Sequence, residues 1–269
     1  MEMVLKIAKV YKIGMITGCQ HWKRVLLPCI LLAVWHGITT SGMVTPILLP
    51  SPAQVFDALV VMLANGELAT HLGTSMIRVL EGFILAALLG VGLGLVLGIF
   101  PLMFELLDGL IQLLRPIPPI AWLPLSILWF GIEEGSKIFI IIIGAFFPIF
   151  INVLDGIRQT DHKFVELSQV LEVPRRKFIA KVVIPGALPF IISGLRIGLG
   201  YAWMCVVAAE LSAGMKGVGY MLTDARALAQ TDRVLVGMLA IGVIGKIMDS
   251  MLRAMEKRII RWKESFTGV

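Results

Sequence analysis

Two ionisable residues stand within or beside strongly apolar stretches of the sequence. Arg196 falls inside the apolar segment 187–209, and Glu210 follows it directly. A charge at membrane depth costs several kcal/mol unless it is paired or hydrated, so both residues are candidates for a pore or a gate. Snorkelling or side-chain pairing is the alternative to solute contact for each of them. A third feature, Lys246 three residues before Asp249, predicts an ion pair on one helix face.

Further pore or gate candidates lie in a proline-rich segment. Residues 115–125 read RPIPPIAWLPL and include Arg115, Pro118 and Trp122. Prolines remove backbone donors and kink helices, and non-helical backbone at membrane depth is tolerated only where it is buried in protein or lines a cavity. We therefore expect this segment to face the protein interior, either as a pore lining or as a kink needed for packing.

The sequence shows no residue set typical of an enzyme. It has no Ser-His-Asp set, no histidine pair at metal spacing, no carboxylate dyad in an apolar segment and no nucleotide-binding loop. Its three cysteines have neither metal nor disulfide spacing. We therefore expect no catalytic, cofactor or metal site in this chain. If it moves a solute, the energy must come from a partner or from an ion gradient.

Composition places the chain in a membrane. Hydrophobic residues make up 58% of its 269 residues, charged residues make up 16%, and the mean hydropathy is +0.90. A soluble globule of this composition would have too few polar side chains to cover itself. A helix that crosses the bilayer needs about 20 apolar residues. The sequence therefore predicts an all-α polytopic membrane protein with about six transmembrane helices.

The predicted organisation places one span and one interfacial segment before a core domain. Prolines at positions 50 and 52 precede an apolar face too short to span, which predicts an interfacial helix on the outer side. The predicted segments are a tail at 1–24, a first span at 25–43, the interfacial segment at 48–66, a core domain at 67–255 that contains a loop at 156–186, and a tail at 256–269. The five core spans are expected at about 79–100, 108–130, 138–154, 187–209 and 234–251.

The positive charge of the chain is explained by orientation. The formal net charge is +6, and the excess of Lys and Arg gathers in the two tails and in the 156–186 loop. Lys and Arg are enriched on the cytoplasmic side of membranes, where anionic lipid attracts them. Both termini and the loop are therefore predicted to be cytoplasmic, in contact with lipid, and no nucleic-acid partner is expected.

Glycines in the second span predict close helix packing. Gly90, Gly94 and Gly98 stand four residues apart and leave one helix face without side chains. Small residues at this spacing let a second backbone approach closely in lipid. They are not a phosphate cradle, because a nucleotide loop needs a preceding strand and a phosphate-binding lysine.

The basic loop has a helical pattern of its own. Four apolar residues fall on one helix face: Phe164, Leu167, Val170 and Leu171. Asp161 or Thr160 can cap the start of this helix. Because a proline disfavours the α region at the residue before it, we expect the helix to end near Glu172 and a second helix to begin at Pro174.

Two later prolines, Pro185 and Pro189, are expected to break the second helix. The loop is therefore predicted to form a helix, a turn and a helix lying against the membrane.

This loop resembles the cytoplasmic signature loop of bacterial ABC importer permeases. The matching residues are Glu166, Leu167, Ser168, Leu171 and the pair Ile184-Pro185. The family usually has alanines where Leu167 and Ser168 stand and a glycine where Glu172 stands. The resemblance extends over about residues 48–263, and residues 208–222 resemble the outer gate region of the family. The Leu-Pro-Ser-Pro run at 49–52 and the proline-rich segment at 115–125 resemble the subgroup that handles nitrate, taurine and alkanesulfonates.

The resemblance implies a type I importer permease, with the loop as a coupling helix that docks on an ATP-hydrolysing subunit. The implied docking residues are Glu166, Leu167, Ser168, Leu171, Glu172 and Pro174. It also implies a homodimer of permeases, two subunits that carry ATP and Mg²⁺, and a periplasmic solute-binding protein, all at a bacterial inner membrane. The solute would be small and similar to nitrate, a sulfonate, taurine or bicarbonate.

A secondary transporter driven by an ion gradient is the alternative function. Such a transporter would need buried carboxylates or matched broken helices in two halves of the chain. Neither is evident in the sequence.

Overall fold

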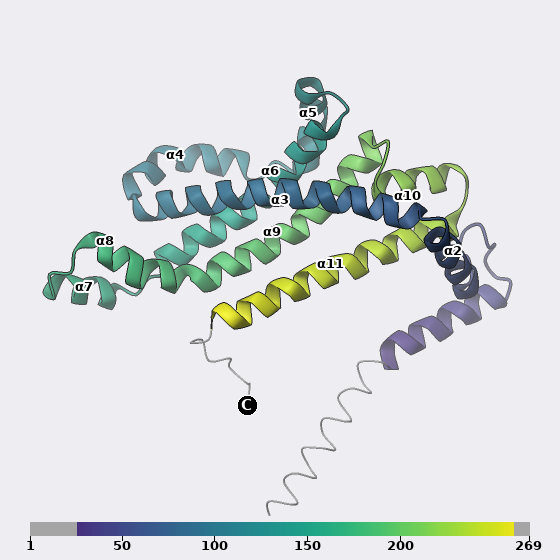
Figure 1. Ribbon diagram of the computed structural model, residues 1–269, viewed down its shortest axis with the longest axis horizontal. Coiled ribbons are helices and arrows are strands. Elements are labelled where there is room, and N and C mark those ends of the chain that lie inside the picture. Colours follow the sequence, from purple (N-terminus) through teal and green to yellow (C-terminus); the bar gives the residue numbers. More distant parts are fainter. Residues whose placement is uncertain (1–25, 261–269) are drawn as a thin grey trace, which may run out of the picture. The chain divides into compact units, whose positions relative to one another are not determined.

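The computed structural model describes residues 26–260, and every regular element in this range is a helix (Figure 1). The chain divides into two compact units. The smaller unit holds residues 26–65 and 225–236, and the larger unit holds residues 66–224 and 237–260. The predicted fold class, an all-α membrane protein, is confirmed.

The smaller unit contains two short apolar helices, Leu26–Thr40 and α2 (Pro52–Ala64). A capping box starts α2: the amide of Gln54 donates to the Ser51 hydroxyl over 3.3 Å, and the amide of Ser51 donates to the Gln54 side chain over 2.8 Å. The indole of Trp35 donates to the Pro50 carbonyl over 3.0 Å. The helices occupy the segments predicted as a first span and an interfacial helix.

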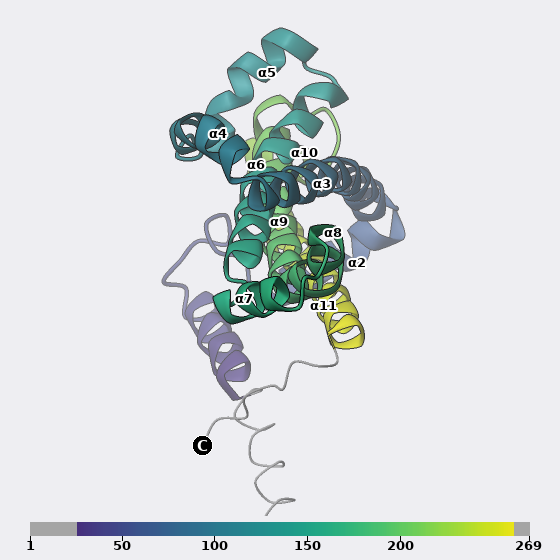
Figure 2. The ribbon, with the colours of Figure 1, turned by 90° about the vertical axis from the view of Figure 1, so that its left-hand side faces the viewer.

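The larger unit is built around three long helices, α3 (Glu67–Ile99), α6 (Glu134–Arg158) and α9 (Ile184–Ala213). Helix α6 packs against both α3 and α9. Its buried apolar residues form the centre of the core: Ile140, Ile141, Ala145, Ile149 and Val153. Figures 1 and 2 show the short helices α7 (His162–Val170) and α8 (Arg175–Phe178) at one end of these three helices.

The glycine face of α3 lies against α6. A Cβ atom added at Gly94 would stand 2.7 Å from the Val153 Cβ and 3.0 Å from the Phe150 carbonyl oxygen. Added Cβ atoms at Gly90 and Gly98 would likewise stand 3.0 Å from Ile149 and 2.7 Å from Ile157. Real side chains do not approach this closely, so only glycine allows the two backbones to pack at this distance.

The predicted third span is two helical pieces. Helix α4 (Pro101–Leu114) begins seven residues earlier than expected, and a 3₁₀ turn (Pro119–Trp122) joins the chain to α5 (Leu123–Phe130). The two pieces are bent by 87°. The prolines between them have no N–H to donate, so a straight helix cannot continue through this segment.

The prediction that Pro185 and Pro189 break the helix after the loop is wrong. The chain is helical from Arg175 to Ala213, with a wide π turn at Ile179–Val183. Pro185 stands in the first turn of α9, directly after the π turn, and Pro189 lies inside the helix. Membrane helices tolerate such prolines because local π adjustment and neighbouring groups satisfy the freed backbone carbonyls.

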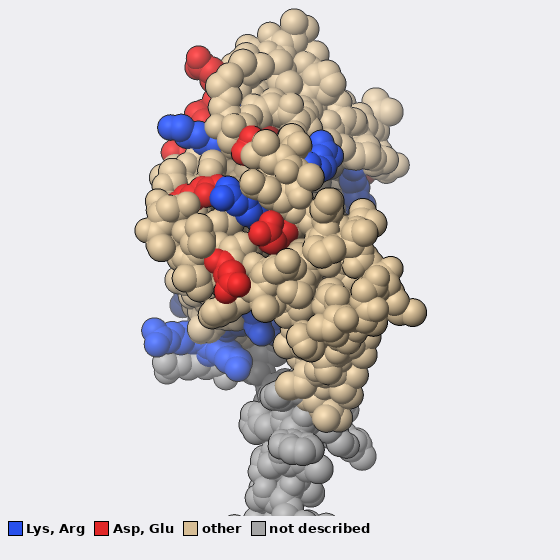
Figure 3. Space-filling view, turned by 90° about the vertical axis from the view of Figure 1, so that its right-hand side faces the viewer, with Lys and Arg blue, Asp and Glu red and all other residues tan. Residues whose placement is uncertain are grey.

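Two more helices follow, α10 (Val218–Ala227) and α11 (Thr231–Ile259). In residues 26–260, four helices are long and apolar enough to cross a membrane, and the bent pair α4–α5 would make a fifth. Large apolar side chains such as Leu88, Leu106, Leu128 and Met204 are mostly exposed. Figure 3 shows one face on which broad areas carry neither acidic nor basic side chains. This surface is suited to lipid.

Candidate functional site

Helix α7 is the first element of the candidate coupling site. Asp161, one of the two predicted caps, is its N-cap, and the Asp161 carboxylate accepts a hydrogen bond from the Lys163 amide over 3.0 Å. The helix ends at Val170, with Leu171 as its C-cap, which agrees with the predicted end near Glu172. The Ser168 hydroxyl donates to the Val165 carbonyl over 2.7 Å, so it is bound within the helix.

The apolar face predicted for α7 is uncovered. The exposed fractions are 53% for Phe164, 52% for Leu167, 79% for Val170 and 64% for Leu171. Glu166 lies beside this face and is also exposed. Together with α8, the face borders a hollow of about 260 Å³. A helix of nine residues that leaves its apolar side uncovered is not stabilised by packing there, and such a surface is typical of a partner site.

A tight turn connects α7 with α8. Glu172 adopts the left-handed conformation, with φ of +49°, which favours glycine. The amide of Val173 donates to the Ser168 carbonyl over 2.9 Å, and the amide of Glu172 donates to Gln169 over 3.1 Å. Pro174 precedes α8 as its N-cap, one residue outside the helix that was predicted to begin with it. The turn conformation favoured by glycine is therefore kept despite the glutamate.

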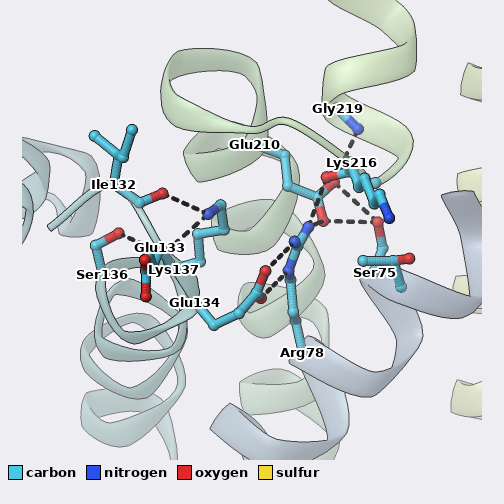
Figure 4. Close-up of polar contacts among 12 residues, drawn as sticks. Ser75, Arg78, Ile132, Glu133, Glu134, Ser136, Lys137, Glu210, Lys216 and Gly219 are labelled. Atoms are coloured by element: carbon cyan, nitrogen blue, oxygen red, sulfur yellow. Dashed lines mark hydrogen bonds and ion pairs between the residues drawn. The ribbon is translucent and has the colours of Figure 1, made fainter. Parts of the chain in front are cut away.

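A buried charge cluster, drawn in Figure 4, lies where α6 begins and α9 ends, away from α7. Arg78 of α3 is 3% exposed and contacts two carboxylates. Its Nη1 donates to Glu210 of α9 over 2.7 Å, and its Nη2 donates to Glu134 of α6 over 2.6 Å. One guanidinium therefore joins all three long helices. The side chain of Glu210 is fully buried, whereas that of Glu134 is 59% exposed.

The same cluster fixes the connection between α9 and α10. The Glu210 carboxylate accepts hydrogen bonds from the Ser75 hydroxyl over 2.8 Å and from the Gly219 amide over 2.9 Å. Arg78 also donates to the Lys216 carbonyl over 2.7 Å. Both carboxylate oxygens of Glu210 thus accept hydrogen bonds from the protein itself. Side-chain pairing, the alternative to solute contact, therefore accounts for this residue.

Lys137 is a second buried cation near this cluster. It is 2% exposed, and its ammonium group donates to the carbonyls of Ile132 and Glu133, each over 2.9 Å (Figure 4). These carbonyls precede α6, so the lysine closes the turn that leads into the helix.

Arg196 is also paired. Its Nε donates to Asp249 over 3.0 Å and its Nη1 donates to Glu256 over 3.2 Å, so it links α9 to α11. The predicted pair of Lys246 with Asp249 is wrong, because Asp249 binds Arg196 and Arg253 instead. Asp249 thus pairs with an arginine on another helix and with the arginine four residues later on α11, and not with the lysine three residues before it.

The remaining pore candidates lie at the break between α4 and α5. Arg115 is the C-cap of α4 and is exposed, Pro118 precedes the 3₁₀ turn and is exposed, and Trp122 ends that turn half-buried. Arg115 borders a hollow of about 280 Å³. The charged pore candidates therefore differ. Arg196 and Glu210 bind groups of the protein itself, whereas Arg115 is exposed and lines a hollow.

Sequence reasoning missed Arg78 and the role of Glu134. Arg78 directly precedes the span expected at 79–100, and Glu134 falls between the spans expected at 108–130 and 138–154. The sequence does show an arginine one residue before an apolar run, but this position alone does not identify the carboxylates that the arginine binds. Within residues 26–260, no group of three His, Cys, Asp or Glu residues could hold a metal ion.

Comparison with known proteins identifies the family. Residues 90–261 match the family described as binding-protein-dependent transport system inner membrane component. A Bacillus subtilis protein named as an aliphatic sulfonates transport permease, SsuC, is 43% identical, with 91% of this chain and 89% of that protein covered. The taurine transport system permease TauC of Escherichia coli is 37% identical, with 87% and 86% covered. The nitrate import permease NrtB of Synechocystis is 33% identical, with 86% of each covered.

A solved structure shares the fold. The MetNI methionine ABC transporter, in an inward-facing conformation, contains a chain that matches with a TM-score of 0.52 and 17% identity, over 67% of this chain and 92% of that one. At this identity, the likeness shows a shared fold. The match to the family model, together with relatives 33–43% identical over most of their length, shows that the chain belongs to the binding-protein-dependent transport system inner membrane components and is an ABC importer permease.

Proposed function

We propose that this permease carries a small oxyanion-bearing solute, of the sulfonate, taurine or nitrate class, across a bacterial inner membrane. ATP and Mg²⁺ are bound and used by a separate subunit, and a periplasmic binding protein delivers the solute. Two copies of the chain form the pathway, with both termini in the cytoplasm. The names of the sulfonate, taurine and nitrate relatives support the solute class.

One observation carries the proposal: the uncovered apolar face of α7. Phe164, Leu167 and Leu171 surround a hollow that an apolar side chain of a partner could fill. Arg175, Arg176 and Lys177 follow directly and are exposed, which places positive charge beside the apolar face. An apolar centre with a charged rim is the usual anatomy of a protein interface.

The helices provide a route for the motion. The turn at Glu172 joins α7 to a helix that is continuous from Arg175 to Ala213. When the ATP-binding subunits close on nucleotide, the docked α7 moves, and this long helix transmits the displacement toward Glu210 at its far end. The charge cluster at Glu210 then moves α3, α6 and α9 together, which switches the pathway between inward-open and outward-open. This is coupling between two sites through a rigid element.

The test is ATP-driven uptake of a sulfonate, taurine or nitrate by proteoliposomes that hold this chain, its ATP-hydrolysing subunit and its binding protein. Leu167→Asp places a charge on the docking face. Loss of a central interface residue costs about 2 kcal/mol or more, which corresponds to about 30-fold weaker docking. Gln169→Asp is the matched control, because Gln169 lies on the other side of the same helix, at a different hollow.

We expect Leu167→Asp to abolish coupled uptake and copurification of the ATP-hydrolysing subunit, and Gln169→Asp to retain both. Equal behaviour of the two variants would contradict docking on this face. Uptake by the chain alone, driven by a proton or sodium gradient, would instead establish the secondary transporter.

A further inference from the structure

A small hollow opens at the middle of the larger unit, away from the charge cluster and from α7. It has a volume of about 280 Å³ and lies between the break after α4 and one face of α6 and α9. Its polar lining comes from Arg115, Asn152 and Tyr201, and Phe147 and Ile197 are among its apolar walls. Liquid water occupies about 30 Å³ per molecule, so the hollow has room for a small organic anion.

The hollow lies at membrane depth. Gly144, which borders it, stands about 15 Å from the start of α6, and Tyr201 stands about 26 Å from the start of α9, at 1.5 Å per residue. Both positions are near the middle of helices that are long enough to span. A charged group here is therefore far from either headgroup region, and a lipid headgroup is not its natural partner.

Arg115 differs from the other arginines at membrane depth. Arg78 is held by Glu134 and Glu210, and Arg196 is held by Asp249 and Glu256. Among residues 26–260, no side chain or carbonyl forms a hydrogen bond or ion pair with the Arg115 guanidinium. An unpaired charge at this depth is costly, so an arginine without a carboxylate partner indicates that an anion binds to it reversibly.

The neighbouring groups extend the same chemistry. Tyr201 lines the hollow and is 44% exposed. Asn152 uses one amide hydrogen on the Pro148 carbonyl, over 2.8 Å, which leaves its second amide hydrogen for another acceptor. A planar guanidinium with two neutral donors matches a group with several oxygen acceptors, such as a sulfonate or nitrate.

We propose that Arg115, Tyr201 and Asn152 form an oxyanion subsite inside the permease, which binds the charged group of the solute during passage. The subsite rests on the proposed import of an oxyanion-bearing solute, and it assigns part of the solute selectivity to this chain. Arg115 supplies the charge, and Tyr201 and Asn152 supply hydrogen bonds that orient the group. The apolar walls accept the carbon chain of a sulfonate.

The test uses the complete reconstituted transporter, with ATP-driven uptake of ethanesulfonate, taurine and nitrate measured over a range of concentrations. Arg115→Gln removes the charge and is expected to lower uptake of the transported anion at least tenfold. Arg115→Lys keeps the charge but loses the planar fork, so an intermediate rate is expected. Tyr201→Phe removes one hydroxyl and is expected to reduce uptake several-fold. Arg258→Gln is the matched control, since it removes the same charge from an exposed position on α11.

The outcomes separate the two proposals. If wild type takes up none of the three anions, the proposed function fails. If wild type transports one of them and Arg115→Gln transports it at the wild-type rate, the subsite is refuted while the function stands. Should Arg115→Gln fail to elute as a folded complex, Arg115→Lys and Tyr201→Phe decide, because wild-type uptake by both would equally overturn the subsite.

Discussion

The charge cluster at Arg78 allows a comparison of two carboxylates on one guanidinium. Glu210→Ala removes a fully buried side chain, and Glu134→Ala removes one that is 59% exposed. Both carboxylates bind Arg78 at comparable distances, 2.7 Å and 2.6 Å, so contact length alone predicts equal effects. Burial predicts that the two effects differ strongly.

The magnitude follows from the partners that each substitution leaves behind. Breaking a buried ion pair costs about 3–5 kcal/mol, because the remaining charge has no water to replace its partner. Without Glu210, the Ser75 hydroxyl and the Gly219 amide also lose their acceptor. Without Glu134, Arg78 keeps Glu210, and water reaches the vacated side, so the loss is about 1 kcal/mol.

Thermal unfolding in detergent measures the difference. At about 2–4 °C per kcal/mol for a chain of this size, we expect Glu210→Ala to lower Tm by roughly 6–20 °C and Glu134→Ala by about 2–4 °C. Adding Arg78→Met to Glu210→Ala removes the unpaired charge and is expected to recover part of the loss. Equal Tm shifts for the two single variants would refute the argument from burial.

Three further predictions test local packing. Gly94→Ala is expected to destabilise the protein by about 1–3 kcal/mol, because the added Cβ would stand 2.7 Å from Val153. Gly92→Ala is the control: the space around its added Cβ is open, so Tm should stay unchanged or rise. Glu172→Gly is expected to stabilise the turn after α7 by about 1 kcal/mol, since φ is +49° there, and slower proteolysis of the loop would show it. Arg196→Ala removes partly exposed ion pairs, so we expect a loss of about 1 kcal/mol with an unchanged KM for uptake. A large KM increase would instead show solute contact.

The sequence determined the features that depend on composition and on short spacings. With 58% hydrophobic residues, the chain has too few polar side chains to form a water-exposed surface, which predicted a membrane protein. Asp161 as the cap of α7, and the helix face carrying Phe164 and Leu167, followed from local rules that need no knowledge of distant residues. The glycine spacing in α3 indicated a close helix contact in the same way.

The tertiary structure decided everything that requires a partner. The glycine spacing in α3 did not identify α6 as the helix it packs against. The position of Arg78 did not identify its partners Glu134 and Glu210, which lie 56 and 132 residues further along the chain. Asp249 binds Arg196 rather than nearby Lys246, because helices α9 and α11 bring a distant charge closer than the local spacing does. Ion pairs are set by distance in space, and a sequence records only distance along the chain.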